Sequence, residues 1–264
     1  MGQAVPVFAP KPLQIRRIDL DRPWTWLAGG WRDFRANLPV GLAYGILAVV
    51  SSYLLTLGFI MLDMLYLVLP AAAGFLLLGP VLAVGLYEAS RRREQGLSTS
   101  LLEAVTAFRH NPVQIALVGV ALLLLWFFWV RTAALLFFLY FGLEPPSVEN
   151  LIVDTFLSTR GLPFLVIGTV VGALFAFVAF AISAVSIPLL LDREEASVME
   201  AIAASVRAVQ TNFAAMLLWG ALIVVFIAFG MVTFFLGLAV TLPLIGHASW
   251  HAYRDLVMVE EQGG

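Results

Sequence analysis

The chain contains no cysteine among its 264 residues. This absence excludes disulfide bonds, thiolate metal sites, iron–sulfur clusters and thiol nucleophiles. Charge is also scarce, since Asp, Glu, Lys and Arg make up 12% of the chain, whereas soluble domains contain roughly a quarter. Hydrophobic residues account for 61% and come in blocks that are long enough to cross about 30 Å of hydrocarbon. The composition therefore predicts an integral membrane protein.

Alternating hydrophobicity over strand-length segments is missing too, so helices are favoured over a membrane β-barrel. We predict an all-α fold with six transmembrane helices in one membrane domain, residues 23–258. The expected spans are residues 38–61, 64–87, 113–142, 163–191 and two short spans within 213–246 that turn near Gly230. Asp63 is expected to form the first turn. Residues 1–22 lack a signal-peptide pattern and are predicted to be a flexible cytoplasmic tail, with a second tail at 259–264.

Basic residues orient the spans, because Lys and Arg favour the cytoplasmic side. With six spans, thirteen of the 15 Lys and Arg residues fall on one side of the membrane, and only Arg131 and Arg160 fall elsewhere. We therefore expect a multi-pass protein of the bacterial cytoplasmic membrane with both termini in the cytoplasm. A nucleic-acid role is disfavoured, since the basic residues lie at span boundaries.

An amphipathic stretch that ends in asparagine precedes each pair of spans, at Asn37, Asn111 and Asn212. The second and third stretches begin with Ser-x-x-Glu, the pattern of a capping box, at Ser100 and Ser197. The sequence thus predicts three parallel repeats of an interfacial amphipathic helix plus a helical hairpin, at about 23–88, 98–191 and 196–256.

Arg131 is the single basic residue inside an apolar run, and an intramembrane charge indicates function by default. It also lies about 20 residues from the start of its span, where an arginine can snorkel to the outer surface. Both interpretations stay open. The expected anchors at the membrane interface are Trp24, Trp31, Arg91, Arg92, Arg93, Trp126, Trp129, Trp250, Tyr253 and Arg254.

His247 and His251, in the stretch GHASWHAYRDL, are four residues apart and would share one face of a helix. The ordinary interpretation is a pair of interfacial histidines at the exit of the sixth span. The alternative is a metal or haem site, for which His110 is the available third ligand. No Gly-rich phosphate loop, no Ser or Thr with a matching base and no paired intramembrane carboxylates occur, so we expect no catalytic site and no cofactor.

Four segments resemble, in this order, a family of bacterial integral membrane proteins catalogued as domain of unknown function 2189. They read LGPVLAVGLYEASRRREQG, AFRHNPVQIAL, SAVSIPLLLDREEASVMEAIAASVRAVQTN and LPLIGHASWHAYRDL. The resemblance spans roughly residues 15–258. It implies no catalytic residues, and some relatives are loosely labelled as cytochrome c oxidase subunits. A catalytic oxidase subunit needs several intramembrane histidines, and this chain has three histidines in all, none of them expected at mid-membrane.

The leading expectation is a non-enzymatic membrane protein that acts as a scaffold, accessory subunit or assembly factor of a membrane complex, such as a respiratory one. Its expected partners are the lipid bilayer and another membrane protein. The alternative is a transporter or channel for a small or lipid-like solute, which the repeats and the prolines in the spans favour. A membrane metalloenzyme is the third possibility.

Overall fold

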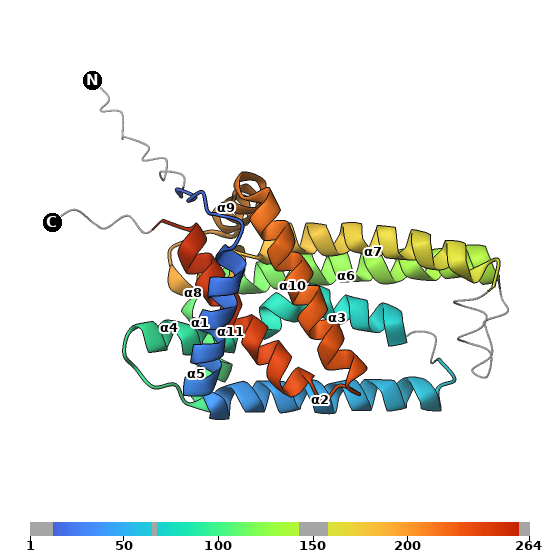
Figure 1. The fold of residues 1–264 in the computed structure, drawn as a ribbon, viewed down its shortest axis with the longest axis horizontal. Coiled ribbons are helices and arrows are strands. Elements are labelled where there is room, and N and C mark those ends of the chain that lie inside the picture. Colours follow the sequence, from blue (N-terminus) through green and yellow to red (C-terminus); the bar gives the residue numbers. More distant parts are fainter. Residues whose placement is uncertain (1–12, 65–67, 143–157, 259–264) are drawn as a thin grey trace, which may run out of the picture.

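The computed structural model describes residues 13–64, 68–142 and 158–258, whose regular elements are helices apart from one isolated β-bridge. Long helices run along the molecule, and short helices gather at one of its ends (Figure 1). In chain order the elements are α1 (Arg22–Ala36), α2 (Leu38–Met61), α3 (Val68–Leu82), α4 (Val84–Glu94), α5 (Leu101–Thr106), η2 (Ala107–His110), α6 (Pro112–Phe141), α7 (Gly161–Ser183), α8 (Ser186–Asp192), α9 (Val198–Thr211), α10 (Phe213–Val232) and α11 (Leu238–Leu256).

Four helical segments are long and apolar enough to cross a membrane: α2, α6, α7 continued through α8, and α10. The other two expected spans do not meet this standard in the described residues. The described part of α3 has 15 residues, fewer than the roughly 20 that a span needs, and the second half of α11 carries histidines, an arginine and an aspartate. The all-helical membrane class is therefore confirmed, with four candidate spans.

Asparagine marks the start of three long helices. Asn37 follows α1 and precedes α2, Asn111 follows η2 and precedes α6, and Asn212 follows α9 and precedes α10. All three asparagines are buried. The two predicted capping boxes are confirmed, since the Ser100 and Ser197 hydroxyls accept the amides of Glu103 and Glu200, whose carboxylates accept the serine amides.

Turns at the opposite end differ in detail from the expectation. Asp63 lies in the turn after α2 with a φ of 55°, as expected of a turn residue. The α10–α11 turn, however, spans residues 233–237 rather than Gly230. Gly230 lies inside α10, where a side chain would meet Leu238 and Thr241, so its role is close packing against α11. The segment between the expected spans 113–142 and 163–191 lies mostly outside the described residues.

Part of the expected flexible tail is held in place. Residues 13–18 run beside the end of α11, where Ile15 forms an antiparallel bridge with Val257. The Arg16 amide donates to the carbonyl of Leu256 at 2.8 Å, and the Met258 amide donates to the carbonyl of Gln14 at 3.0 Å. The prediction of flexibility is thus wrong for these residues, because chain ends far apart in sequence satisfy each other's backbone groups.

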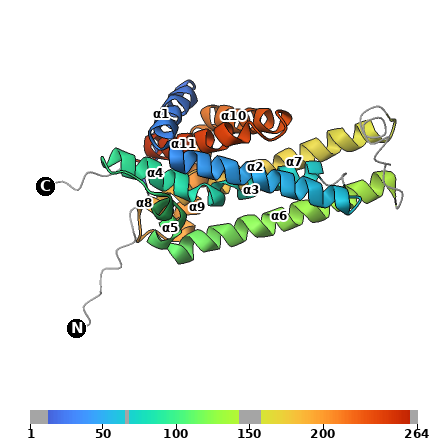
Figure 2. The ribbon, with the colours of Figure 1, turned by 90° about the horizontal axis from the view of Figure 1, so that it is seen from below.

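α11 lies at the centre of the end where the short helices gather and packs against α1, α2, α4 and α10 (Figures 1 and 2). Two glycines permit these contacts. A Cβ at Gly30 of α1 would lie 2.6 Å from the backbone nitrogen of Ala248, and one at Gly45 of α2 would lie within contact distance of the Ala239 carbonyl. α2 and α11 are therefore closely packed at Gly45, whereas Gly168 of α7 has no neighbour within 4 Å among the described residues.

Candidate functional site: a buried polar cluster

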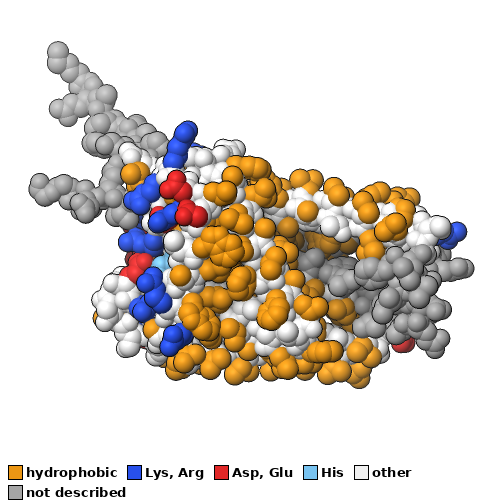
Figure 3. All heavy atoms as spheres, viewed as in Figure 1, with side chains coloured by type: hydrophobic (Ala, Val, Ile, Leu, Met, Phe, Trp, Pro, Cys, Tyr) orange, Lys and Arg blue, Asp and Glu red, His pale blue; other side chains and the backbone are white. Residues whose placement is uncertain are grey.

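Charged side chains gather at the end of the molecule where the short helices meet, and apolar side chains cover the visible face beyond it (Figure 3). α1, α4, α5, α8 and the second half of α11 supply most of these charges. We call this region the charged end. It contains the buried ionisable groups of the described residues, so any site built on titratable chemistry would lie here.

Asp33 of α1 is the centre of the largest network. Its carboxylate is 2% exposed and is paired with the guanidinium of Arg93 from α4. Its second oxygen lies 2.9 Å from Nε2 of His251 on α11. One carboxylate therefore joins three helices, and Gly29 and Gly30 allow the approach because any side chain there would collide with His251 or α11.

The pKa of Asp33 lies below its ordinary value. Burial acts to raise this pKa, but hydrogen bonds from His251, Ser90 and Arg93 outweigh the burial and favour the ionised form. The carboxylate is therefore a fixed negative charge at neutral pH. This charge stabilises the network and is not set up to take part in proton transfer.

His247 lies beside this network and is fully buried. Its Nδ1 is 2.8 Å from the Ser90 hydroxyl oxygen. Nε2 of the same ring has no hydrogen-bond partner among the described residues. Burial lowers the pKa of His247 to about 4, so the ring is neutral at pH 7. Ser90 is itself fully buried, so this pair cannot act as an exposed nucleophile and base.

His110 belongs to a separate network. The Arg91 guanidinium donates to both oxygens of buried Glu88, at 2.7 and 3.1 Å, and approaches Nε2 of His110 at 3.2 Å. The other ring nitrogen of His110 lies 3.1 Å from Glu194. The rings of His110, His247 and His251 thus bind different partners, and no group of three ligands able to hold a metal ion occurs in the described residues. The geometry does not support the metal hypothesis.

Two further carboxylates fix α11 to its neighbours. Asp255 accepts two hydrogen bonds of 2.7 Å from Arg22 and one of 2.9 Å from the Trp26 indole. Burial acts to raise the pKa of Asp255, but these hydrogen bonds outweigh it and lower the pKa. Asp192 accepts from the Tyr253 hydroxyl at 2.7 Å. Each network joins elements that are distant in sequence, so together they hold the charged end rigid.

Several expected interface anchors have other roles. Trp250 and Tyr253 are 0% and 1% exposed, which contradicts their assignment to the membrane interface. The physical reason is that α11 does not leave the bundle at the interface but runs through the centre of the charged end. Trp129 is also buried, against Phe175 of α7, and the indole of Trp126 lies against Gly74 of α3.

The arginine anchors are paired with carboxylates. Arg91, Arg92 and Arg93 contact Glu88, Glu103 and Asp33, and Arg254 contacts Glu94 and Asp192. Trp24 and Trp31 of α1, in contrast, are 55% and 43% exposed, and their assignment to the membrane interface stays a prediction. Arg131 is exposed on α6, about 29 Å along the helix axis from Pro112 at 1.5 Å per residue.

Sequence reasoning missed Asp33, Asp255, Ser90 and Glu88. The burial of Asp33 could have been predicted, since it lies seven residues after Trp26 and next to Phe34 on the apolar stripe of α1. A carboxylate on a buried stripe requires a partner. The partners themselves come from α4 and α11, and no local pattern connects those helices with α1.

Comparison with known proteins gives a match to one family model and no function. The model of the family described as "Predicted integral membrane protein (DUF2189)" matches residues 68–192. No curated protein and no solved structure matches the chain. The matched region contains α3 to α8, including Glu88, Ser90 and the three consecutive arginines of α4. The resemblance seen in the sequence is therefore confirmed through residues 68–192, which are similar to a family of predicted integral membrane proteins, domain of unknown function 2189.

Proposed function

We propose that the protein is a non-enzymatic scaffold, accessory subunit or assembly factor of a membrane complex. One observation carries this proposal: the most apolar windows of the four candidate spans have only 6–28% of their residues buried. The spans bury little surface against one another, whereas α11 at the charged end is closely surrounded. Such spans present wide apolar faces to lipid and to the helices of another protein.

α7 offers the most surface to a partner. Its window is the least buried, at 6%, and Gly168 on this helix has open space where a side chain would project. Transmembrane helices associate where small residues let two backbones approach. The polar cluster supports the same proposal, since its carboxylates are held by arginines, histidines and an indole rather than turned toward a substrate.

The proposed topology has six spans in three parallel repeats, with the charged end in the cytoplasm of a bacterium. Three observations support it. An amphipathic helix, a buried asparagine and a long helix recur in this order at Asn37, Asn111 and Asn212. The returning chain is interrupted near the charged end between α3 and α4 and between α7 and α8, and α11 contains Pro243. The basic residues also gather at this end, as cytoplasmic ones do (Figure 3).

Affinity purification of the full chain in mild detergent, followed by mass spectrometry, tests the proposed role. The wild type is expected to co-purify with the same membrane protein in repeated preparations. Gly168→Leu should reduce the recovery of this partner, because a large side chain would keep a partner helix from α7. Val170→Leu, at an exposed position on the same helix, is the matched control and should keep the partner. Recovery of the chain with lipid alone would overturn the proposal.

A second candidate function is transport of a small or lipid-like solute, which a cavity between α2, α3 and the α10–α11 turn favours. Its lining contains three hydroxyl groups and no ionisable side chain. Transport of phospholipid predicts that vesicles containing the purified chain scramble a fluorescent phospholipid between leaflets. Scrambling at the rate of protein-free vesicles would leave the accessory role as the better account.

A further inference from the structure

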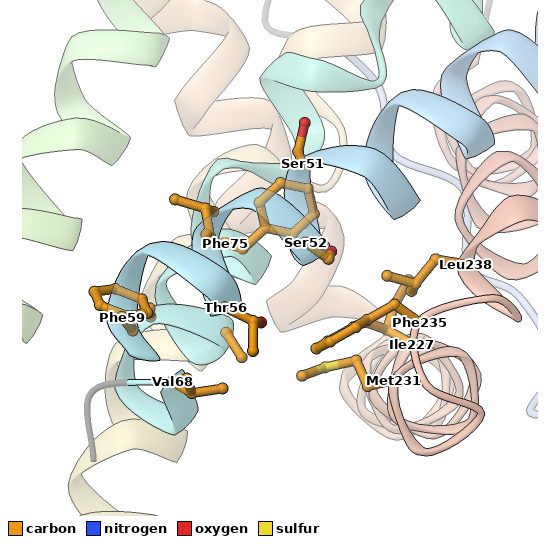
Figure 4. Close-up of a pocket in the computed structure, with 13 residues that line it drawn as sticks. Ser51, Ser52, Thr56, Phe59, Val68, Phe75, Ile227, Met231, Phe235 and Leu238 are labelled. Carbon is orange, nitrogen blue, oxygen red and sulfur yellow. The ribbon is translucent and has the colours of Figure 1, made fainter. Parts of the chain in front are cut away.

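The cavity lies between two helical hairpins, in the half of the molecule away from the charged end. α2 contributes Ser52 and Thr56, α3 contributes Phe75, and Met231 and Phe235 come from α10 and the turn that follows it. Figure 4 shows Phe235 and Met231 facing Ser52 and Thr56 across the space. Its volume of about 60 Å³ is several times the ~10–15 Å³ that one water-sized group needs. A short run of methylene groups therefore fits inside.

Hydroxyl groups line one wall of this cavity at membrane depth. Ser51, Ser52 and Thr56 lie roughly 20–27 Å along α2 from Leu38, counted at 1.5 Å per residue, which is between the midplane and the far surface of a 30 Å hydrocarbon layer. Water is scarce at this depth, so an unpaired hydroxyl there costs free energy.

These three hydroxyls make no hydrogen bond to any part of the chain that the structure describes. Other hydroxyls in the same chain do, since those of Thr106, Ser183 and Thr233 bond to the carbonyl four residues earlier in their own helices. The hydroxyls of the cavity are therefore available to a ligand. That ligand needs apolar bulk together with a hydrogen-bonding group.

The wall opposite the hydroxyls is held in an unusual backbone conformation. Phe234 and Phe235 have φ values of 54° and 65°, in the left-handed region that side chains other than glycine rarely adopt. The Tyr53 hydroxyl donates to the Phe234 carbonyl at 2.7 Å, and the Phe235 ring packs edge-on against Tyr53. Such strain persists where surrounding contacts enforce it, and it is frequent at ligand clamps.

We infer that this cavity binds the upper acyl chain and ester carbonyl of a bilayer glycerolipid from the leaflet opposite the charged end. The ester carbonyl accepts a hydrogen bond from Thr56, and the methylenes pack against Phe75, Met231 and Phe235. Leu55 on the rim is exposed toward the hydrocarbon, so a chain can enter sideways. No ionisable residue lines the cavity, so the headgroup stays outside and its charge is not selected.

Photolabelling of the purified full chain tests the inference. The protein is reconstituted in phosphatidylcholine vesicles containing a small fraction of phosphatidylcholine with a diazirine near the ester end of one acyl chain. Adducts are then mapped by mass spectrometry. We expect them to concentrate on Phe75, Met231 and Phe235. An even distribution over exposed residues such as Leu54 and Val225 would show ordinary surrounding lipid and overturn the inference.

Variants sharpen the test. Ser52→Leu fills the cavity and should abolish the concentrated adducts. Thr56→Val keeps the volume and removes one hydroxyl, so the adduct yield at low photolipid should fall by roughly tenfold, the equivalent of one hydrogen bond. Leu54→Phe, at an exposed position of α2, is the matched control and should label like the wild type.

Unchanged labelling of Ser52→Leu would overturn the inference. If Ser52→Leu does not fold, Thr56→Val decides, and labelling equal to that of the wild type would then overturn it. The result is separate from the proposed accessory role, since the vesicles contain no partner and partner recovery by Thr56→Val is expected to equal that of the wild type.

Discussion

Nε2 of His251 lies 2.9 Å from a carboxylate oxygen of Asp33, 218 positions earlier in the chain. This contact fixes α11 against α1, and the same carboxylate holds Arg93 of α4. This buried negative charge thus joins three helices of the charged end. Its removal is the most direct way to separate the three helices.

Asp33→Asn should lower the free energy of unfolding by about 2–3 kcal/mol, near the low end for breaking a buried ion pair because Arg93 is partly exposed. The substitution removes the charge and leaves Arg93 and His251 without their partner. Denaturant unfolding in mild detergent, followed by tryptophan fluorescence, measures the change. Asp21→Asn, at an exposed position just before α1, is the control and should unfold like the wild type. Equal stability of the two variants would show that the Asp33 network does not hold the helices.

His247 should make stability depend on pH. Its pKa falls from 6.5 to about 4 on folding, because burial disfavours the charged ring. The unfolded chain therefore binds more protons between these values, and the stabilisation present above pH 6.5 is lost as pH falls toward 4. The slope contributed by this residue is at most about 1.4 kcal/mol per pH unit.

His247→Gln has no titrating ring and should flatten this slope, while its amide can still form a hydrogen bond with Ser90. Melting temperatures measured from pH 7.5 to 4.5 in the same detergent provide the comparison. His110→Gln, in the other network, serves as the control. If the wild type and His247→Gln had parallel profiles, the buried neutral histidine would not be the cause.

Two glycines of α2 provide a matched test of close packing. Gly45→Ala should destabilise the protein by about 1–3 kcal/mol, because the new methyl group would overlap the Ala239 backbone of α11. Gly58 has no neighbour within 4 Å in the described residues, so Gly58→Ala should be neutral or stabilising by up to about 1 kcal/mol through helix propensity. Unfolding measurements on both variants decide between packing and propensity. The packing account fails if Gly45→Ala is as stable as Gly58→Ala.

Local signals in the sequence predicted local structure well. The capping boxes at Ser100 and Ser197 and the turn at Asp63 are confirmed, because each depends on residues near one another in the chain. Trp250 shows that such local signals do not predict burial by distant helices. Its neighbours, an aromatic and an arginine after an apolar run, match an interface anchor, yet the residue is buried.

Trp250 is buried because other helices cover α11. α1 and α4 are held over α11 by contacts such as Asp33 with His251 and Ser90 with His247. The residues of these pairs are 218 and 157 positions apart in the chain. Periodicity within one helix shows that a face is buried but does not say which other segment covers it. The candidate site was therefore predictable only as a set of separate residues, and Asp33 became visible as its centre once the helices were assembled.

The asparagines that begin the long helices should differ in their contribution to stability. Asn212 accepts the Ile18 amide at 3.0 Å and donates to the Arg16 carbonyl at 2.9 Å, whereas the hydrogen bond of the Asn37 side chain is to the Asp33 carbonyl in its own helix. Asn212→Ala leaves two backbone groups of the N-terminal segment without partners and should cost about 1–3 kcal/mol. Asn37→Ala should cost less. Unfolding of the two variants side by side tests this order, and the reverse order would contradict it.

The number of spans can be decided by cysteine labelling, because the chain has no cysteine of its own. With six spans, Gln95 at the end of α4 lies on the cytoplasmic side, and both Asp63 and Leu236 lie in turns on the opposite side. If the segment containing α3 does not cross, residues 63 and 95 lie on the same side. The described part of α3 is shorter than a typical span, so this pair is the critical comparison.

Single cysteines at Asp63, Gln95 and Leu236 should therefore react differently with a membrane-impermeant maleimide. In inside-out vesicles we expect labelling of Gln95→Cys alone, and in right-side-out vesicles labelling of the other two. The distribution of charge supports this expectation, since thirteen of the 15 basic residues fall on one side only if both α3 and α11 return the chain across the bilayer. Labelling of Asp63→Cys and Gln95→Cys from the same side would reject six spans. It would also reject the threefold repeat, because that repeat requires a returning helix in each unit.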